Sequence, residues 1–229
     1  MGAAMRSLLS AAAAVLALGA TSASATTVTL LVAGSITVSD DSNSVTNGSI
    51  TVGVPYTATI VYDLTAAFDR EPDPTYGDWV VPAASSSVMV SVGNYIFDAA
   101  NPLVLGIENG FTLPNLDTAG WLVLGLSGVG SLDPGVSWGT GYTAGSLFDY
   151  TGKAAISDLL ADANWNRADY GPDDQAFELV IEVFDPRTAG RDHLSLRGTI
   201  DMITVIVPEP ATLILLAVGV LPVLRRGSR

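Results

Sequence analysis

The chain has 229 residues, with 10 lysines and arginines against 23 aspartates and glutamates, one histidine and no cysteine. The lack of cysteine excludes disulfide scaffolds, thiolate metal sites and cysteine nucleophiles, and one histidine excludes a multi-histidine metal site within a single chain. The net charge of −13 argues against nucleic acid as a partner, because phosphate binding requires a basic surface.

Residues 1–25 have the three parts of a secretory signal peptide. Arg6 supplies the positive charge, and residues 8–20 form a run of apolar and small side chains. Ala23 and Ala25 are the small residues that a signal peptidase requires before the cleaved bond. The apolar run is too short to span a bilayer, so we expect cleavage after Ala25 rather than anchoring.

Residues 26–206 are expected to form one β-domain, because side chains alternate between apolar and polar and are rich in valine, isoleucine and threonine. Gly93 and Asn94 have the chemistry of a two-residue hairpin turn. Short antiparallel strands separated by turn residues favour a single β-sandwich that is jelly-roll-like. The expected strands are 28–38, 49–52, 56–64, 88–98, 103–109, 121–126, 177–185 and 194–207.

One segment, 153–163, has apolar residues at helical spacing and predicts a short helix. At this length it needs to pack against the sheet to persist.

Acidic loops suggest a metal site. Asp169, Asp173 and Asp174 surround a Gly-Pro turn, and carboxylates on loops are the ligands that calcium prefers. The alternative is a solvated acidic loop that keeps an exported protein soluble. Calcium is the only cofactor that the sequence suggests.

Catalytic patterns are weak. Asp192, His193 and Ser195 are neighbours in sequence, and adjacency does not assemble a triad. Glu178 and Glu182 share a strand face about 13 Å apart, too far for the carboxylate pair of a glycosidase. We therefore expect no catalytic residues and no enzyme activity, with a secreted glycoside hydrolase as the more distant alternative.

Four aromatic residues in glycine- and asparagine-rich contexts are candidates for sugar stacking: Trp138, Tyr142, Trp165 and Tyr170. Exposed aromatic rings next to polar side chains bind the faces of sugars. The alternative is that these rings close the ends of the sandwich or cover the helix.

The C-terminal segment, 207–229, is expected to lie outside the β-domain. Pro208, Glu209 and Pro210 form an extended link, because proline removes a backbone donor. The apolar run that follows would span about 21 Å as a helix, short of the ~30 Å hydrocarbon core. Arg225 and Arg226 then favour retention on the cytoplasmic side.

This order of a Pro-Glu-Pro motif, an apolar stretch and an arginine cluster resembles the PEP-CTERM sorting signal of Gram-negative bacteria. The resemblance implies export through the inner membrane, transient insertion of the tail and recognition by an exosortase, a membrane-embedded cysteine protease. Signal peptidase and exosortase would be transient partners, and the cell surface or extracellular matrix the destination. We therefore expect a non-enzymatic matrix protein associated with exopolysaccharide, or alternatively a carbohydrate-binding module of that matrix.

Overall fold

Antiparallel β-strands make up most of the described structure. The computed structural model describes residues 27–41, 45–70, 73, 75–99, 101–109, 117–129, 132, 135–149, 160, 163–170, 175–186 and 192–207. Its elements are β1 Thr27–Asp41, β2 Pro55–Asp63, β3 Phe68–Asp69, β4 Tyr76–Val81, the 3₁₀ turn η2 Ala83–Ser85, β5 Ser86–Val92, β6 Tyr95–Ala99, β7 Leu103–Asn109, β8 Asp117–Val129, β9 Ser137–Asp149, the 3₁₀ turn η4 Arg167–Asp169, β10 Gln175–Phe184, β11 Asp192–Gly198 and β12 Met202–Ile206. The prediction of an all-β chain is confirmed.

Eight strands close into a ring. Their order is β8, β6, β5, β2, β1, β11, β10 and β9, and β9 pairs with β8 again. The remaining strands extend this ring: β7, β4 and β3 continue from β8, and β12 pairs with β1. The architecture is a closed eight-stranded barrel with extra strands, and it does not clearly match the jelly-roll-like sandwich expected. Periodicity identifies strands and their buried faces, but it does not identify which strands pair.

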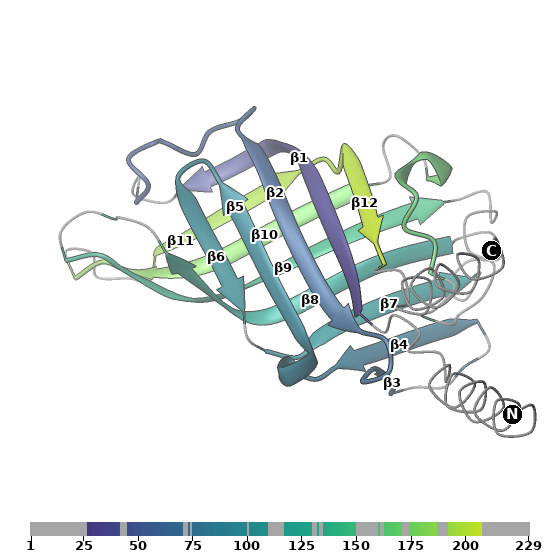
Figure 1. Cartoon of the computed structure of the whole chain (residues 1–229). Coiled ribbons are helices and arrows are strands. Elements are labelled where there is room, and N and C mark those ends of the chain that lie inside the picture. The colour runs from purple at the N-terminus through teal and green to yellow at the C-terminus, as the bar shows by residue number, and fades with distance from the viewer. Residues whose placement is uncertain are drawn as a thin grey trace, which may run out of the picture. The chain divides into compact units, whose positions relative to one another are not determined.

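The barrel is flattened into two sheets that cross (Figure 1). We call β12, β1, β2, β5 and β6 the front sheet, and β4, β7, β8, β9, β10 and β11 the back sheet. The sheets join where the end of β8 pairs with β6, and where the last part of β1 pairs with β11. Their facing sides bury the core, whose largest fully buried side chains include Tyr56, Tyr62, Phe97 and Phe177.

The corner between β11 and β12 depends on a close approach of two backbones. β1 pairs with β11 from Ile36 onward and with β12 before that, so the chain changes sheets at residues 199–201. A Cβ added at Gly34 would collide with the Thr199 carbonyl oxygen. The same oxygen accepts a hydrogen bond from the buried Tyr56 hydroxyl at 2.9 Å. The single strand expected over 194–207 is therefore two strands.

Other local predictions had mixed outcomes. Gly93 and Asn94 do form the β5–β6 hairpin turn, with Gly93 at φ 57°. Residues 49–52 form turns instead of a strand, because the buried Val45 and Ile50 anchor a loop rather than one face of a sheet. The expected helix over 153–163 lies outside the described residues apart from Leu160 and Ala163.

β4 and β9 lie outside the strands expected from the sequence. Glycines interrupt the apolar pattern of β9, although the packing requires them: a Cβ at Gly141 would collide with the Val180 carbonyl, and one at Gly145 with the Trp121 indole. In the part of the chain that the structure describes, no helix has the length and apolar character needed to cross a membrane.

Candidate functional site

A groove crosses the outer face of the back sheet from β4 to β9, and we call it the β4–β9 groove. Four residues occupy adjacent cross-strand positions along its length: Asp78, Gly106, Gly120 and Ser146. A Cβ added at Gly106 would meet no atom within 4 Å. The missing side chain at Gly106 leaves open space in the groove, which has a volume of about 300 Å³. A Cβ at the paired Gly120 would instead lie 2.9 Å from the Gly145 carbonyl oxygen.

Alternation along β8 shows which face the groove occupies. Ala119, Trp121 and Val123 are buried in the barrel interior, so Thr118, Gly120 and Leu122 belong to the opposite, outer face. The Trp121 indole still closes the floor from beneath, because it packs against Gly145 on the neighbouring strand.

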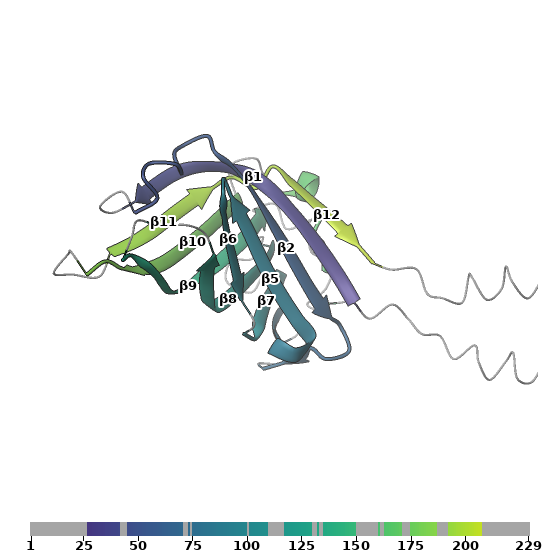
Figure 2. The ribbon, with the colours of Figure 1, turned by 60° about the vertical axis from the view of Figure 1, so that its left-hand side comes forward.

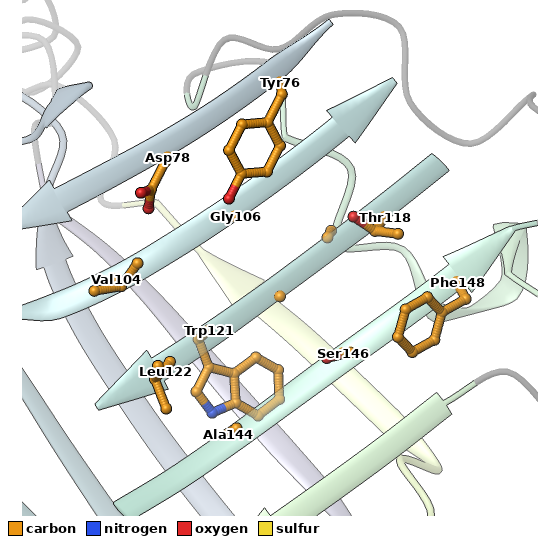
Figure 3. Close-up of a pocket in the computed structure, with 12 residues that line it drawn as sticks. Tyr76, Asp78, Val104, Gly106, Thr118, Trp121, Leu122, Ala144, Ser146 and Phe148 are labelled. Carbon is orange, nitrogen blue, oxygen red and sulfur yellow. The ribbon is translucent and has the colours of Figure 1, made fainter. Parts of the chain in front are cut away.

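The two walls of the groove differ in chemistry (Figure 3). One wall carries two aromatic rings and a hydroxyl, and the other is aliphatic. The first consists of Tyr76, Thr118 and Phe148, and the second of Val104, Leu122 and Ala144. Tyr76 and Phe148 stand on β4 and β9, so the rings flank the two ends of one wall.

The β4 end of the groove is polar. Arg70 donates two hydrogen bonds to the same Asp78 oxygen, Oδ2, from Nε at 3.0 Å and from Nη2 at 2.5 Å. The Asp78 backbone N–H donates to Asp69 Oδ1 at 3.2 Å, and the Asp78 carbonyl accepts from the Arg70 N–H at 2.9 Å. Asp78 is therefore a buried hydrogen-bond acceptor. Asp69 of β3 and the adjacent Arg70 fix its orientation.

Three of the four predicted sugar-stacking rings lie away from this groove and pack in the interior. Trp165 and Tyr170 are buried, and Trp165 contacts Trp121 with a ring-centre distance of 6.5 Å. Trp138 is half-buried and packs nearly perpendicular to Phe97, with ring centres 5.3 Å apart. The four rings therefore do not form one exposed platform.

Tyr142 alone among these four is on the outer face of the back sheet, two residues along β9 from the groove residue Ala144. Burial, followed by the nearby Glu178 charge, raises the pKa of Tyr142 above its ordinary value, and the Arg197 charge opposes this shift. Arg197 also binds Glu178, with Nε 3.3 Å from Oε1. Tyr142 thus belongs to a small polar cluster beside the groove.

The calcium prediction is only partly covered by the described residues. Asp169 is exposed, and its Oδ2 accepts hydrogen bonds from the side-chain amides of Asn164 and Asn166 at 3.0 Å each. Asp173 and Asp174 lie outside the described residues. No group of three potential ligands within the described ranges is arranged to hold a metal ion.

Two buried carboxylates near Asp169 were missed by sequence reasoning. Asp117 and Asp149 face each other across the β8–β9 pair and are 1% and 4% exposed. Burial raises the pKa of Tyr170 above its ordinary range, and the charges of Asp117, Asp169 and Asp149 raise it further. All three carboxylates therefore act on one hydroxyl, although no sequence spacing indicates this.

The possible triad residues do not converge. Asp192 is buried on one face of β11, whereas His193 and Ser195 lie on the other. His193 Nε2 lies 3.4 Å from Asp40 Oδ2, and both side chains are exposed. The processing residues Ala23, Ala25, Pro208, Glu209, Pro210, Arg225 and Arg226 are outside the described residues.

Comparisons with models of protein families, with curated proteins and with solved structures find no match to this chain.

Proposed function

We propose that the chain is an exported, non-enzymatic surface or matrix protein that associates with exopolysaccharide by binding sugar units in the β4–β9 groove. The single observation that carries the binding function is the glycine floor between an aromatic wall and an aliphatic wall. The signal-peptide pattern and the PEP-CTERM-like tail support the export route and the destination.

The groove offers the two kinds of contact that sugars use. The apolar C–H faces of a sugar ring pack on aromatic side chains such as Tyr76 and Phe148. Sugar hydroxyls need fixed hydrogen-bonding groups, and Asp78, Thr118 and Ser146 supply these along the same groove. A volume of about 300 Å³ is at the lower end of the range for small-molecule sites. A short stretch of a polysaccharide therefore fits better than a large ligand.

A hydrolase is the competing function, and one pair of carboxylates favours it. Asp78 and Glu108 are both buried and lie diagonally across β4 and β7. The backbones at diagonal cross-strand positions are about 7–8 Å apart, and an inverting glycosidase needs its two carboxyl groups about 6.5–9.5 Å apart. However, Glu108 does not line the groove and Arg70 already engages Asp78. Release of reducing ends that disappears in both Asp78→Asn and Glu108→Gln would favour hydrolysis over simple binding.

Gly106→Leu tests the binding function. The new side chain fills the groove, while the open space around Gly106 leaves the fold undisturbed. We expect calorimetric titration with exopolysaccharide fragments from the producing host to show binding by the wild type and at least tenfold weaker binding by Gly106→Leu, or 1.4 kcal/mol. Thr59→Leu on the front sheet is the control and should bind like the wild type. Equal binding by Gly106→Leu at an unchanged melting temperature would exclude the groove.

The export route is tested separately, by the termini of the mature protein. Mass spectrometry of exported material from the native host should find the chain beginning after Ala25 and ending before Arg225. Replacing Pro208, Glu209 and Pro210 with alanine should leave a folded precursor in the inner membrane. An exported protein that retains Arg229 in a host with active exosortase would contradict the sorting function.

A further inference from the structure

β12 exposes large apolar side chains at the margin of the front sheet. Met202, Val205, Ile206 and the following Val207 are 52%, 44%, 45% and 51% exposed. Among the described strands, β12 pairs only with β1, and residues 202–207 carry no charge. An uncharged apolar edge strand invites pairing with other chains unless something covers it.

The position of β12 in the chain indicates what covers it. Ile206 pairs with Thr29 near the beginning of β1, and β12 runs beside that part of β1 along the margin of the sheet (Figure 2). The proposed membrane segment begins at Ala211, four residues after Val207. Four extended residues reach about 14 Å at most. While the tail is inserted, the end of β12 must therefore lie within about 14 Å of lipid.

Charge favours the same surface. Between Thr27 and Val207 the chain has 22 acidic residues against 6 basic ones. The anionic headgroups of the inner membrane repel acidic surfaces. The barrel can therefore approach the bilayer closely only through an uncharged region. Within the reach of the tether, residues 202–207 provide such a region, with apolar side chains suited to the interface.

We propose that β12, through Met202, Val205, Ile206 and Val207, contacts the lipid interface of the inner membrane for as long as the precursor is anchored. The inference rests on the proposed sorting function, because it requires the tail to be inserted. It adds a second role for the membrane: the bilayer covers an edge that would otherwise pair with other copies until the protein is released.

The absence of cysteine allows a direct test on the full-length precursor in proteoliposomes of phosphatidylethanolamine and phosphatidylglycerol. Single-cysteine variants carry an environment-sensitive fluorophore, and a quencher is attached to the lipid acyl chains. Ile206→Cys reports on β12, and Leu216→Cys reports on insertion of the tail. Leu124→Cys is the matched control, since Leu124 is 59% exposed on the back sheet. Melting curves verify that each labelled protein is folded.

We expect quenching of both the Leu216→Cys and Ile206→Cys labels, several-fold stronger than for Leu124→Cys. Quenching at position 216 without quenching at 206 would overturn the lipid contact while leaving the sorting function intact. Failure to quench at 216 would contradict tail insertion, and the inference would fall with it. A label at 206 that is shielded from water, unquenched by lipid and sensitive to the protein-to-lipid ratio would show a second copy on β12 and also overturn the proposal.

Discussion

Glycines of the back sheet fall into two groups that differ in what lies above the Cα atom. At Gly145 the space is filled by the buried Trp121 indole, and at Gly141 by the Val180 carbonyl. At Gly106 the space is open and forms the groove. The same residue type thus permits close packing in one place and leaves room for a ligand in another.

This difference predicts opposite effects of the same substitution. Gly145→Ala should lower the free energy of unfolding by about 1–3 kcal/mol, because a rigid indole must shift in a packed core. Gly106→Ala should leave it unchanged or raise it by about 0.4–1 kcal/mol, because alanine restricts only the unfolded chain. Urea denaturation of the two variants measures both effects. Equal stabilities would show that Trp121 does not pack against Gly145 as described.

At the scale of elements, the corner between β11 and β12 lies where β1 changes its partner strand. The backbone N–H groups of Thr199 and Asp201 donate hydrogen bonds to the carbonyls of Ser35 and Ala33 at 3.0 and 2.9 Å. These bonds hold the corner against β1, between its pairing with β11 and its pairing with β12. Tyr56 adds its hydroxyl to Thr199 and stacks on Phe177 with ring centres 3.9 Å apart. The front and back sheets meet at this point.

Gly34→Ala should loosen this corner, because the added methyl group collides with the Thr199 carbonyl oxygen. We expect hydrogen exchange to accelerate at the amides of β12 and residues 199–201, with little change in the β8–β9 pair on the far side of the barrel. Gly106→Ala is the matched control, since it adds the same methyl group in open space. Unchanged exchange in β12 would contradict the close approach at Gly34.

Strands with clean alternation were predictable, and strands shaped by their neighbours were not. The expected strand 177–185 closely matches β10, where Phe177, Leu179 and Ile181 are fully buried on one face. β9 was not predicted because its glycines accommodate Trp121 and Val180, residues distant in sequence. Local pattern carries the first kind of information, whereas only the tertiary arrangement carries the second.

At the scale of the whole molecule, buried tyrosines couple the fold to alkaline pH. Burial raises the pKa of Tyr62 from 10.0 to about 12, opposed by a smaller effect of Trp165. Burial likewise raises the pKa of Tyr56 and Tyr170. The unfolded chain releases these protons near pH 10, whereas the folded chain retains them. The contribution of Tyr62 to stability is therefore present below pH 10 and is lost between about pH 10 and 12.

Tyrosinate absorbance and near-ultraviolet circular dichroism, followed together as the pH rises, measure this coupling. We expect ionisation of the buried tyrosines to coincide with cooperative unfolding above pH 10. If all the tyrosines titrate near pH 10 while the dichroism stays native, these side chains are accessible and the described core is wrong.

The β4–β9 groove is formed only by the assembled sheet, so it could not be predicted from the sequence. Asp78, Gly106, Gly120 and Ser146 come from four strands and meet only through the pairing register. Three of the four aromatic residues predicted from local context pack in the interior. The prediction failed because glycine and asparagine neighbours do not distinguish an exposed aromatic ring from a buried one. The signal peptide and the sorting tail are inferred from contiguous sequence patterns, and both remain predictions.

The most direct test of sugar binding in the β4–β9 groove is an NMR titration of the isotope-labelled protein with exopolysaccharide fragments from the producing host. We predict that the amide shifts that change on binding cluster at Tyr76, Gly106, Gly120 and Ser146, and that Gly106→Leu abolishes these changes. Saturable binding whose shift changes lie on other surfaces, with these four amides unaffected, would contradict the account.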